Sequence, residues 1–181
     1  RAIAFSDHRL NARRTRGGGA LKVTISDGLN TRAVYTRSTF TNNRVLDSPP
    51  AEGHGGAIYH LEDDWAGGST EDNMEISESL FDGNYSPKQG GGVWLSINGR
   101  GRIVNTTFHN NRAATAGTNI IGQGGGLVVS SGVIDIRHDT FANNFATFQG
   151  GAIFAGSGQA VTLSSSIFYQ NRLDPTHTDK G

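Results

Sequence analysis

The sequence predicts an all-β fold, a right-handed parallel β-helix (β-solenoid) of about five rungs with loop inserts. Glycine accounts for 26 of 181 residues, about twice its ordinary share, which indicates many tight turns. Two short motifs alternate along the chain, 25 to 37 residues apart, a length typical of stacked repeats. The runs between them alternate with a period of two, as strands do. We expect residues 1–181 to form one domain, a piece of a longer solenoid.

Charge and cysteine content exclude several classes of protein. The chain has 16 basic and 16 acidic residues, so we expect no nucleic-acid partner, which would require a positive field. No run of 18 apolar residues occurs, so no transmembrane helix is expected. Because the chain has no Cys, disulfides, Cys-ligated zinc and a Cys nucleophile are excluded.

The first motif is a glycine pair followed by apolar residues. The pair allows a positive φ and a close backbone approach that a Cβ would block. The motif occurs at Gly18–Leu21, Gly55–Ile58, Gly91–Trp94, Gly125–Val128 and Gly150–Ile153. We expect a strand after each pair, with Leu21, Ile58, Trp94, Val128 and Ile153 in the lumen. The other side of that strand then carries an apolar outward stripe, Tyr59, Leu95, Val129 and Phe154, covered by a partner, a loop or another copy.

The second motif is Phe-x-x-Asn. It occurs at Phe40–Asn43, Phe81–Asn84, Phe108–Asn111, Phe141–Asn144 and Phe168–Asn171. We expect the Phe rings to stack in the interior, with Phe108 buried between Phe81 and Phe141. Each Asn should bond backbone or the next Asn at a turn. Two residues before each Phe lies a small polar residue (Ser38, Ser79, Thr106, Asp139 or Ser166), predicting a hydroxyl ladder in which Asp139 is an N–H acceptor.

The alternation of the two motifs resembles the repeats of the chlamydial polymorphic membrane proteins and of related bacterial surface β-helix proteins. This resemblance covers nearly the whole chain. It implies a right-handed parallel β-helix with an extracellular or cell-surface location and, in many members, an adhesive role.

Right-handed β-helices also include polysaccharide lyases and hydrolases, so we searched for catalytic groups. Glu62, Asp63 and Asp64 are weak candidates for a calcium site, and a solvated acidic loop is the alternative. No adjacent outward pair of carboxylates occurs, and neighbours in the run Arg137–Asp139 should face opposite sides of a strand. His54 and His60 flank a Gly-Gly turn and are expected to be turn or surface residues. We therefore assign no catalytic residue and no cofactor.

A row of basic and aromatic residues follows the Asn positions. It contains Arg44, Tyr85, Arg112 and Arg172, with Arg9 and Phe145 in the same register. Such a stripe suits an anionic glycan, although these residues could equally pack their stems over the edge of the coil.

The sequence favours a non-catalytic extracellular scaffold, adhesive or self-assembling end to end into a surface structure or fibre. The alternative is a polysaccharide lyase or glycoside hydrolase of the pectin-lyase-like β-helix class. Neither terminus shows a cap, so the expected partners are further rungs or other copies. A host receptor and an anionic glycan are the other candidate partners.

Overall fold

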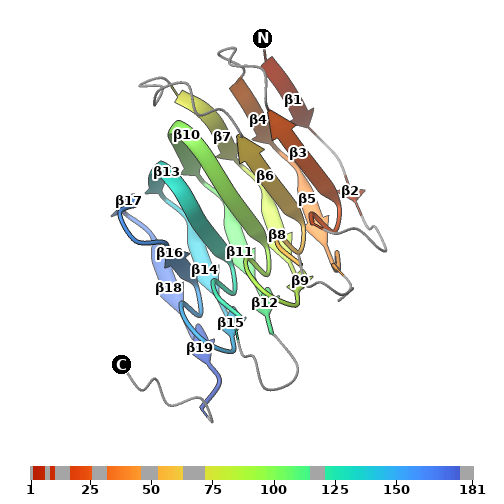
Figure 1. The fold of residues 1–181 in the computed structure, drawn as a ribbon, viewed down its shortest axis with the longest axis vertical. Coiled ribbons are helices and arrows are strands. Elements are labelled where there is room, and N and C mark those ends of the chain that lie inside the picture. The colour runs from red at the N-terminus through yellow and green to blue at the C-terminus, as the bar shows by residue number, and fades with distance from the viewer. Residues whose placement is uncertain are drawn as a thin grey trace.

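A computed structural model describes residues 2–6, 9–10, 17–25, 32–45, 53–62, 72–114 and 121–175. Every regular element in these ranges is a β-strand, and the strands stack in parallel along the molecule (Figure 1). The predicted all-β solenoid is therefore confirmed. Within the same ranges no helix occurs that could cross a membrane.

The largest sheet, sheet A, forms one wall of the solenoid. Its strands are β1 (Ala2–Ser6), β3 (Leu21–Ile25), β4 (Arg32–Thr36), β6 (Ile58–Glu62), β7 (Asp72–Ser77), β10 (Val93–Val104), β13 (Leu127–Arg137), β16 (Ile153–Ala155) and β17 (Ala160–Ser164). β10 and β13 each cross sheet A as one long strand, whereas the coil before β10 crosses it as two shorter strands, β6 and β7. Strand β6 pairs with the first part of β10, and β7 pairs with the second part.

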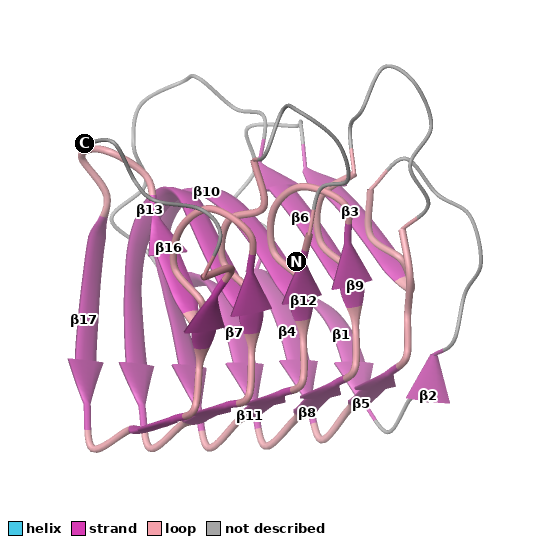
Figure 2. Cartoon of the chain, turned by 90° about the horizontal axis from the view of Figure 1, so that it is seen from below, coloured by secondary structure: helices cyan, strands magenta, loops and turns pink. Residues whose placement is uncertain are grey.

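Two narrower sheets complete each coil (Figure 2). Sheet B contains β2 (Arg9–Leu10), β5 (Thr39–Thr41), β8 (Leu80–Asp82), β11 (Thr107–His109), β14 (Thr140–Ala142) and β18 (Ile167–Tyr169). Sheet C contains β9 (Tyr85–Ser86), β12 (Arg112–Ala113), β15 (Phe145–Ala146) and β19 (Arg172–Leu173). Each coil passes from A through B to C, and its backbone bonds are made to the coils on either side.

The corners between the sheets depend on residues with positive φ. Between A and B these are Arg37, Glu78, Asn105, His138 and Ser165, with φ from 46° to 58°. Between B and C they are Asn42, Gly83, Asn110, Asn143 and Gln170. Such values are uncommon outside glycine. Their recurrence at the same corner of successive coils makes them part of the fold, and they hold the strands of one coil at a sharp angle.

The lumen contains the predicted aromatic column. Phe40, Phe81, Phe108 and Phe141 are fully buried. The Phe108 ring lies 4.9 Å from that of Phe81 and 4.6 Å from that of Phe141, nearly parallel to both. The column continues to Phe168, which is 47% exposed in the last described coil. Burial of Phe108 between its two neighbours is thus confirmed.

The Asn ladder beside this column is also confirmed. Asn111 is fully buried, and its side-chain amide donates to Asn144 Oδ1 (3.0 Å) and to the Phe81 carbonyl (2.9 Å). The same Asn144 oxygen accepts the Asn111 backbone N–H. Each Asn therefore satisfies polar groups of adjacent coils that water cannot reach.

The predicted outward stripe of sheet A is partly wrong. Leu95 and Val129 are fully buried in the core. The register explains this, because Trp94, rather than Leu95, pairs with Tyr59. Val128 pairs with Trp94 and with Phe154, so it continues the same row. The cause is the position of the positive φ in motifs with three glycines: it is at Gly90 and Gly124, the first glycine of each run and one residue before the predicted pairs, whereas in the first motif it is at Gly18. Trp94 and Val128 consequently leave the lumen and join Tyr59 and Phe154 outside.

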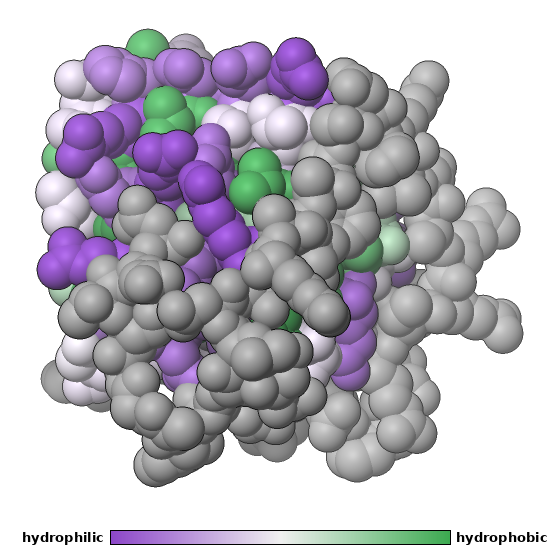
Figure 3. Space-filling view, turned by 90° about the horizontal axis from the view of Figure 1, so that it is seen from above, coloured by the Kyte–Doolittle hydropathy of each residue, from purple (hydrophilic) through white to green (hydrophobic). Residues whose placement is uncertain are grey.

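The outer surface is otherwise mainly polar. Figure 3 shows one face on which the described residues are mostly hydrophilic and the hydrophobic ones form separate groups. The outward row of sheet A is covered by its own chain where it is most aromatic. Trp94 is only 8% exposed, stacks on Tyr59 at 4.6 Å and donates its indole N–H to Gln89.

Candidate functional site

The basic-aromatic row predicted from the sequence forms a continuous ladder on the outside of sheet C. Arg44 pairs with Tyr85, and the pairing continues through Arg112 and Phe145 to Arg172. The residues that follow Arg44, Tyr85, Arg112 and Phe145, namely Val45, Ser86, Ala113 and Ala146, are buried, whereas Leu173 after Arg172 is 47% exposed in the last described coil. Because successive strand residues point to opposite faces, the ladder residues point outward. We call these five residues the sheet C ladder.

Rings and guanidinium groups of the ladder lie on one another. The Arg44 Cζ atom is 4.3 Å from the centre of the Tyr85 ring, and the Arg112 Cζ atom is 4.4 Å from that of Phe145. Both distances are within the range of a cation–π interaction. Tyr85 is fixed in turn, because its hydroxyl donates to the Ala114 carbonyl at 2.8 Å.

The three arginines of the ladder are exposed. None of them forms an ion pair with a carboxylate of the described residues. Their positive charge is therefore available to an external anion, and the rings beneath limit the rotamers that each guanidinium adopts.

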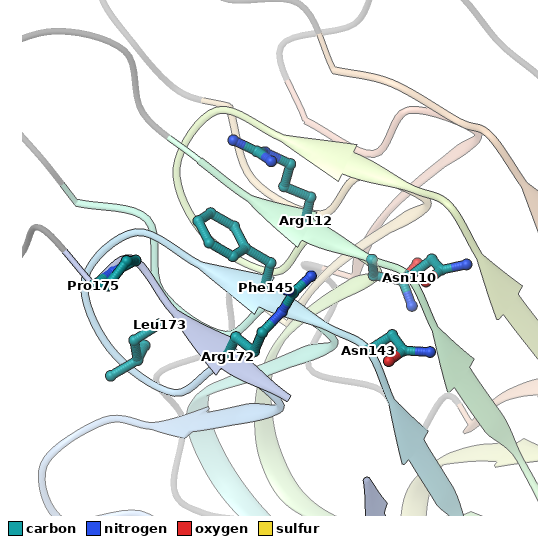
Figure 4. Close-up of a pocket in the computed structure, with 8 residues that line it drawn as sticks. Asn110, Arg112, Asn143, Phe145, Arg172, Leu173 and Pro175 are labelled. Atoms are coloured by element: carbon teal, nitrogen blue, oxygen red, sulfur yellow. The ribbon is translucent and has the colours of Figure 1, made fainter. Parts of the chain in front are cut away.

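A depression of about 640 Å³ adjoins the ladder. Figure 4 shows Arg112, Phe145 and Arg172 on neighbouring strands, with the amides of Asn110 and Asn143 on one side and Leu173 and Pro175 on the other. The two Asn residues occupy the positive-φ corners between sheets B and C, which brings their side chains to the edge of the row. Cationic, amide and apolar groups thus meet on one open surface.

A second polar surface lies on the outside of sheet A. Arg32 and Arg102 both contact the carboxylate of Glu75, and Arg137 contacts that of Asp135. Partial burial disfavours the charged form of Glu75. Hydrogen bonds from Arg102 and Ser77 and the charges of the two arginines outweigh this effect, so the pKa of Glu75 is lowered.

A lowered pKa does not suit a general acid, which must hold a proton near neutral pH. Asp135 lines a groove on this face together with Arg100, Arg102 and His138, and its ion-pair partner is Arg137. Glu75 and Asp135, two described carboxylates of this face, are thus both ion-paired with arginines.

The expectation that neighbours in the run Arg137–Asp139 face opposite sides holds for Asp139 only, because His138 has a positive φ and lines the same groove as Arg137. Arg137 and His138 are exposed, whereas Asp139 is 1% exposed. Asp139 Oδ1 accepts the backbone N–H of Thr106, which confirms its predicted role in the hydroxyl ladder. Burial raises the pKa of Asp139 to about 6, although backbone hydrogen bonds from Thr106 and Arg137 oppose this shift.

A buried polar network in the lumen was missed in the sequence. The Tyr35 hydroxyl is 2.7 Å from His60 Nδ1, and His60 Nε2 is 3.3 Å from Glu62 Oε1. Glu62 Oε2 accepts the Asn98 backbone N–H. Because a carboxylate only accepts hydrogen bonds, Nε2 carries the His60 proton and Nδ1 accepts from Tyr35. Burial, together with the charge of Glu62, raises the pKa of Tyr35.

This network corrects two expectations. His60 is fully buried rather than a turn or surface residue, and Glu62 is 7% exposed rather than part of a solvated loop. Asp63 and Asp64, the other candidate calcium ligands, lie outside the described residues. The described ranges contain no group of three or more His, Cys, Asp or Glu side chains arranged to hold a metal ion. The available signal was that His60 and Glu62 lie two and four residues after Ile58, which was expected in the lumen, since this spacing places both polar residues on the same side of the strand.

Comparison with known families identifies one stretch of the chain. Residues 37–60 match the Chlamydia polymorphic membrane protein repeat. This stretch contains the first described Phe-x-x-Asn motif, the first arginine of the ladder, Arg44, and the glycine pair at Gly55. Comparison with curated proteins and with solved structures gave no match. The chain therefore carries, on a parallel β-solenoid, a segment similar to the repeat of a Chlamydia membrane protein family.

Proposed function

We propose that this protein is a non-catalytic scaffold, located at the cell surface or outside the cell, that binds its ligand through the sheet C ladder. The observation that carries the proposal is the row of three exposed arginines, two of them stacked on aromatic rings and none ion-paired with a described carboxylate. Arginines on a protein surface usually form ion pairs with carboxylates or extend into water. Fixing their positions before binding lowers the entropy cost of capturing a ligand.

The surface location and the adhesive role are supported by the similarity of residues 37–60 to the Chlamydia polymorphic membrane protein repeat. The fold suits this role. Its core columns run the length of the stack, and its outward residues can vary without disturbing them.

Adhesion of beads coated with the chain to cultured cell monolayers tests this function. The triple variant Arg44→Gln, Arg112→Gln, Arg172→Gln should abolish adhesion. The matched control Arg102→Gln, Arg137→Gln removes two exposed arginines from sheet A and should leave adhesion unchanged. Equal adhesion of the wild type and the ladder variant, both shown to be folded by circular dichroism, would contradict the proposal.

A separate observation favours association end to end. In the last described coil Ile167 is 62% exposed, Phe168 47% and Leu173 47%, and no other described residue covers them. Phe168 continues the aromatic column of the lumen, so the position beyond it suits another Phe-bearing coil. We propose that such a coil comes from a second copy or from a further solenoid segment.

Light scattering of the purified chain tests this association over a range of concentrations. Particles should grow with concentration, and Phe168→Glu, in the lumen column, should stop the growth while Tyr169→Glu, outward on the same strand, should not. Monomers at all concentrations would remove this part of the proposal and leave ligand binding unaffected.

A further inference from the structure

The arginines of the sheet C ladder occur on every second coil. Tyr85 lies between Arg44 and Arg112, and Phe145 lies between Arg112 and Arg172. Neighbouring strands of a sheet are about 4.8 Å apart, so the three arginines repeat roughly every 9.6 Å. The ladder is thus a straight row of cations with a fixed period, set by the backbone of the solenoid rather than by flexible loops.

Each stacked guanidinium keeps its hydrogen-bonding edge free. A guanidinium lying over a ring makes contact through its flat face, which leaves its N–H groups directed sideways. The Cζ atoms of Arg44 and Arg112 lie 4.3 and 4.4 Å from the ring centres, a separation that suits such flat contact. A carboxylate or sulfate group approaching the row can therefore bind a guanidinium through two parallel hydrogen bonds.

The geometry points to an extended anionic polysaccharide with an acidic group on every second sugar as the ligand of the ladder. This inference rests on the proposed adhesive function and specifies its ligand. The period of two coils is about the length of a disaccharide, so one acidic sugar would lie at each arginine. The sugar between would lie on the coil that carries Tyr85 or Phe145, where the ring holds the guanidinium above it in place.

Side-chain amides beside the ladder can bind the hydroxyl groups of a sugar chain. The exposed amide of Asn110 and the half-buried amide of Asn143 line the depression next to Arg112 and Arg172. An amide offers both donors and acceptors to sugar hydroxyls. Both side chains occupy positive-φ corners, so the backbone holds them at a constant place relative to the arginines.

Other anionic polymers fit the period less well. In an extended acidic peptide, successive side chains on the same face are about 6.7 Å apart, which is twice the rise per residue. A nucleic-acid strand carries a charge about every 3.4 Å. A polyuronate with an acid on every sugar has twice the required charge density, so half of its charges would have no arginine of the row to bind.

The inference is tested by isothermal titration calorimetry of the full chain with hyaluronan oligosaccharides, which carry one carboxylate on every second sugar. Disaccharide, tetrasaccharide and hexasaccharide reach one, two and three arginines, so affinity should rise at least tenfold at each step. It should then level off beyond the hexasaccharide. Polygalacturonate, polyglutamate and neutral dextran of similar length should bind at least tenfold more weakly than the hexasaccharide.

Variants separate the ladder from general charge. Arg112→Gln, at the middle of the row, should lower hexasaccharide affinity at least tenfold and leave disaccharide affinity within twofold. Arg112→Lys should recover only part of the loss, because it retains charge without the planar fork. Arg137→Gln on sheet A should have no effect. Affinity without steps in oligosaccharide length, or equal losses in Arg112→Gln and Arg137→Gln, would overturn the inference.

The outcome separates the ligand from the function. If beads adhere to cells through the arginines but hyaluronan and polygalacturonate fail to bind, the ligand class is wrong and the adhesive function stands. If the oligosaccharides bind in steps but beads do not adhere, the ligand class is right and the adhesive function falls.

Discussion

Asp139 occupies a position at which the other described coils carry a hydroxyl. Those hydroxyls donate to the carbonyl two residues earlier, at 2.8–3.2 Å, in Ser38, Ser79, Thr106 and Ser166. An ionised carboxylate has no proton to donate. Asp139 Oδ2 is buried and has no hydrogen-bond partner among the described residues. We therefore expect Asp139→Ser to stabilise the fold at neutral pH.

The size of the effect follows from the pKa of Asp139, which burial raises from 3.8 to about 6. The folded state then holds this proton more tightly than the unfolded state. Its contribution to stability is fully present below about pH 4 and is lost as the pH rises through about 6. A shift of two pKa units corresponds to about 3 kcal/mol, and solvent screening at this corner reduces the expected loss to about 1–2 kcal/mol.

Urea denaturation followed by circular dichroism measures this contribution at pH 4, 5, 6, 7 and 8. The difference in unfolding free energy between Asp139→Ser and wild type should be about 1–2 kcal/mol larger at pH 8 than at pH 4. Serine also supplies an oxygen for the Thr106 N–H, so that hydrogen bond is retained. Asp139→Asn, which cannot titrate, should show the same pH trend in its difference from wild type.

Asp135→Ser is the matched control, since Asp135 is an ion-paired carboxylate on the outside of the same coil. It removes one carboxylate from the same coil and leaves the buried corner at Asp139 unchanged. The reasoning is refuted if the difference in unfolding free energy between Asp139→Ser and wild type is independent of pH or falls as the pH rises. Ionisation of the buried carboxylate would then not destabilise the folded state.

Three further predictions concern the stack. Phe108→Ala should lower the unfolding free energy by about 3–5 kcal/mol, because it leaves a cavity in a closed column. Phe108→Leu should lose much less, and equal losses in urea denaturation would contradict this account. Asn111→Ala should cost about 2–4 kcal/mol by leaving the Phe81 carbonyl and neighbouring amide groups unsatisfied, whereas exposed Asn110→Ala should cost under about 1 kcal/mol. Gly91→Ala should prevent folding at 37 °C, because its Cβ would lie 2.2 Å from the Gly125 carbonyl oxygen. Gly158→Ala, which meets nothing within 4 Å, should fold with a cooperative thermal transition.

The core columns were predictable because the spacing inside Phe-x-x-Asn does not vary. A constant offset between Phe108 and Asn111 fixes both at the same place in successive coils, whatever the length of the segments between. The glycine motif has no such constancy. Three copies have three glycines, and the sequence does not state which of them takes positive φ. That depends on backbone contacts such as those of Gly91 with the coil of Gly125, so Leu95 was placed on the wrong side.

The candidate site also has one part that sequence spacing predicts and one part that it does not. The row from Arg44 to Arg172 was found because each member directly follows the Asn position. The stacking distances depend on side-chain rotamers, which spacing does not specify. The network of Tyr35, His60 and Glu62 was missed because polar residues are expected outside, and only the correct pairing of His60 with Leu95 places that histidine in the lumen.

The direction of the backbone hydrogen bonds has a mechanical consequence. In the described coils these bonds connect one coil to the next, so they lie along the axis of the solenoid. A load applied between the first and last coils pulls along the bonds and peels off the outermost coil before the next is strained. Extension should then proceed in small, repeated steps at low force. Under tension such a molecule lengthens gradually, and the coils still stacked keep their arginine row intact.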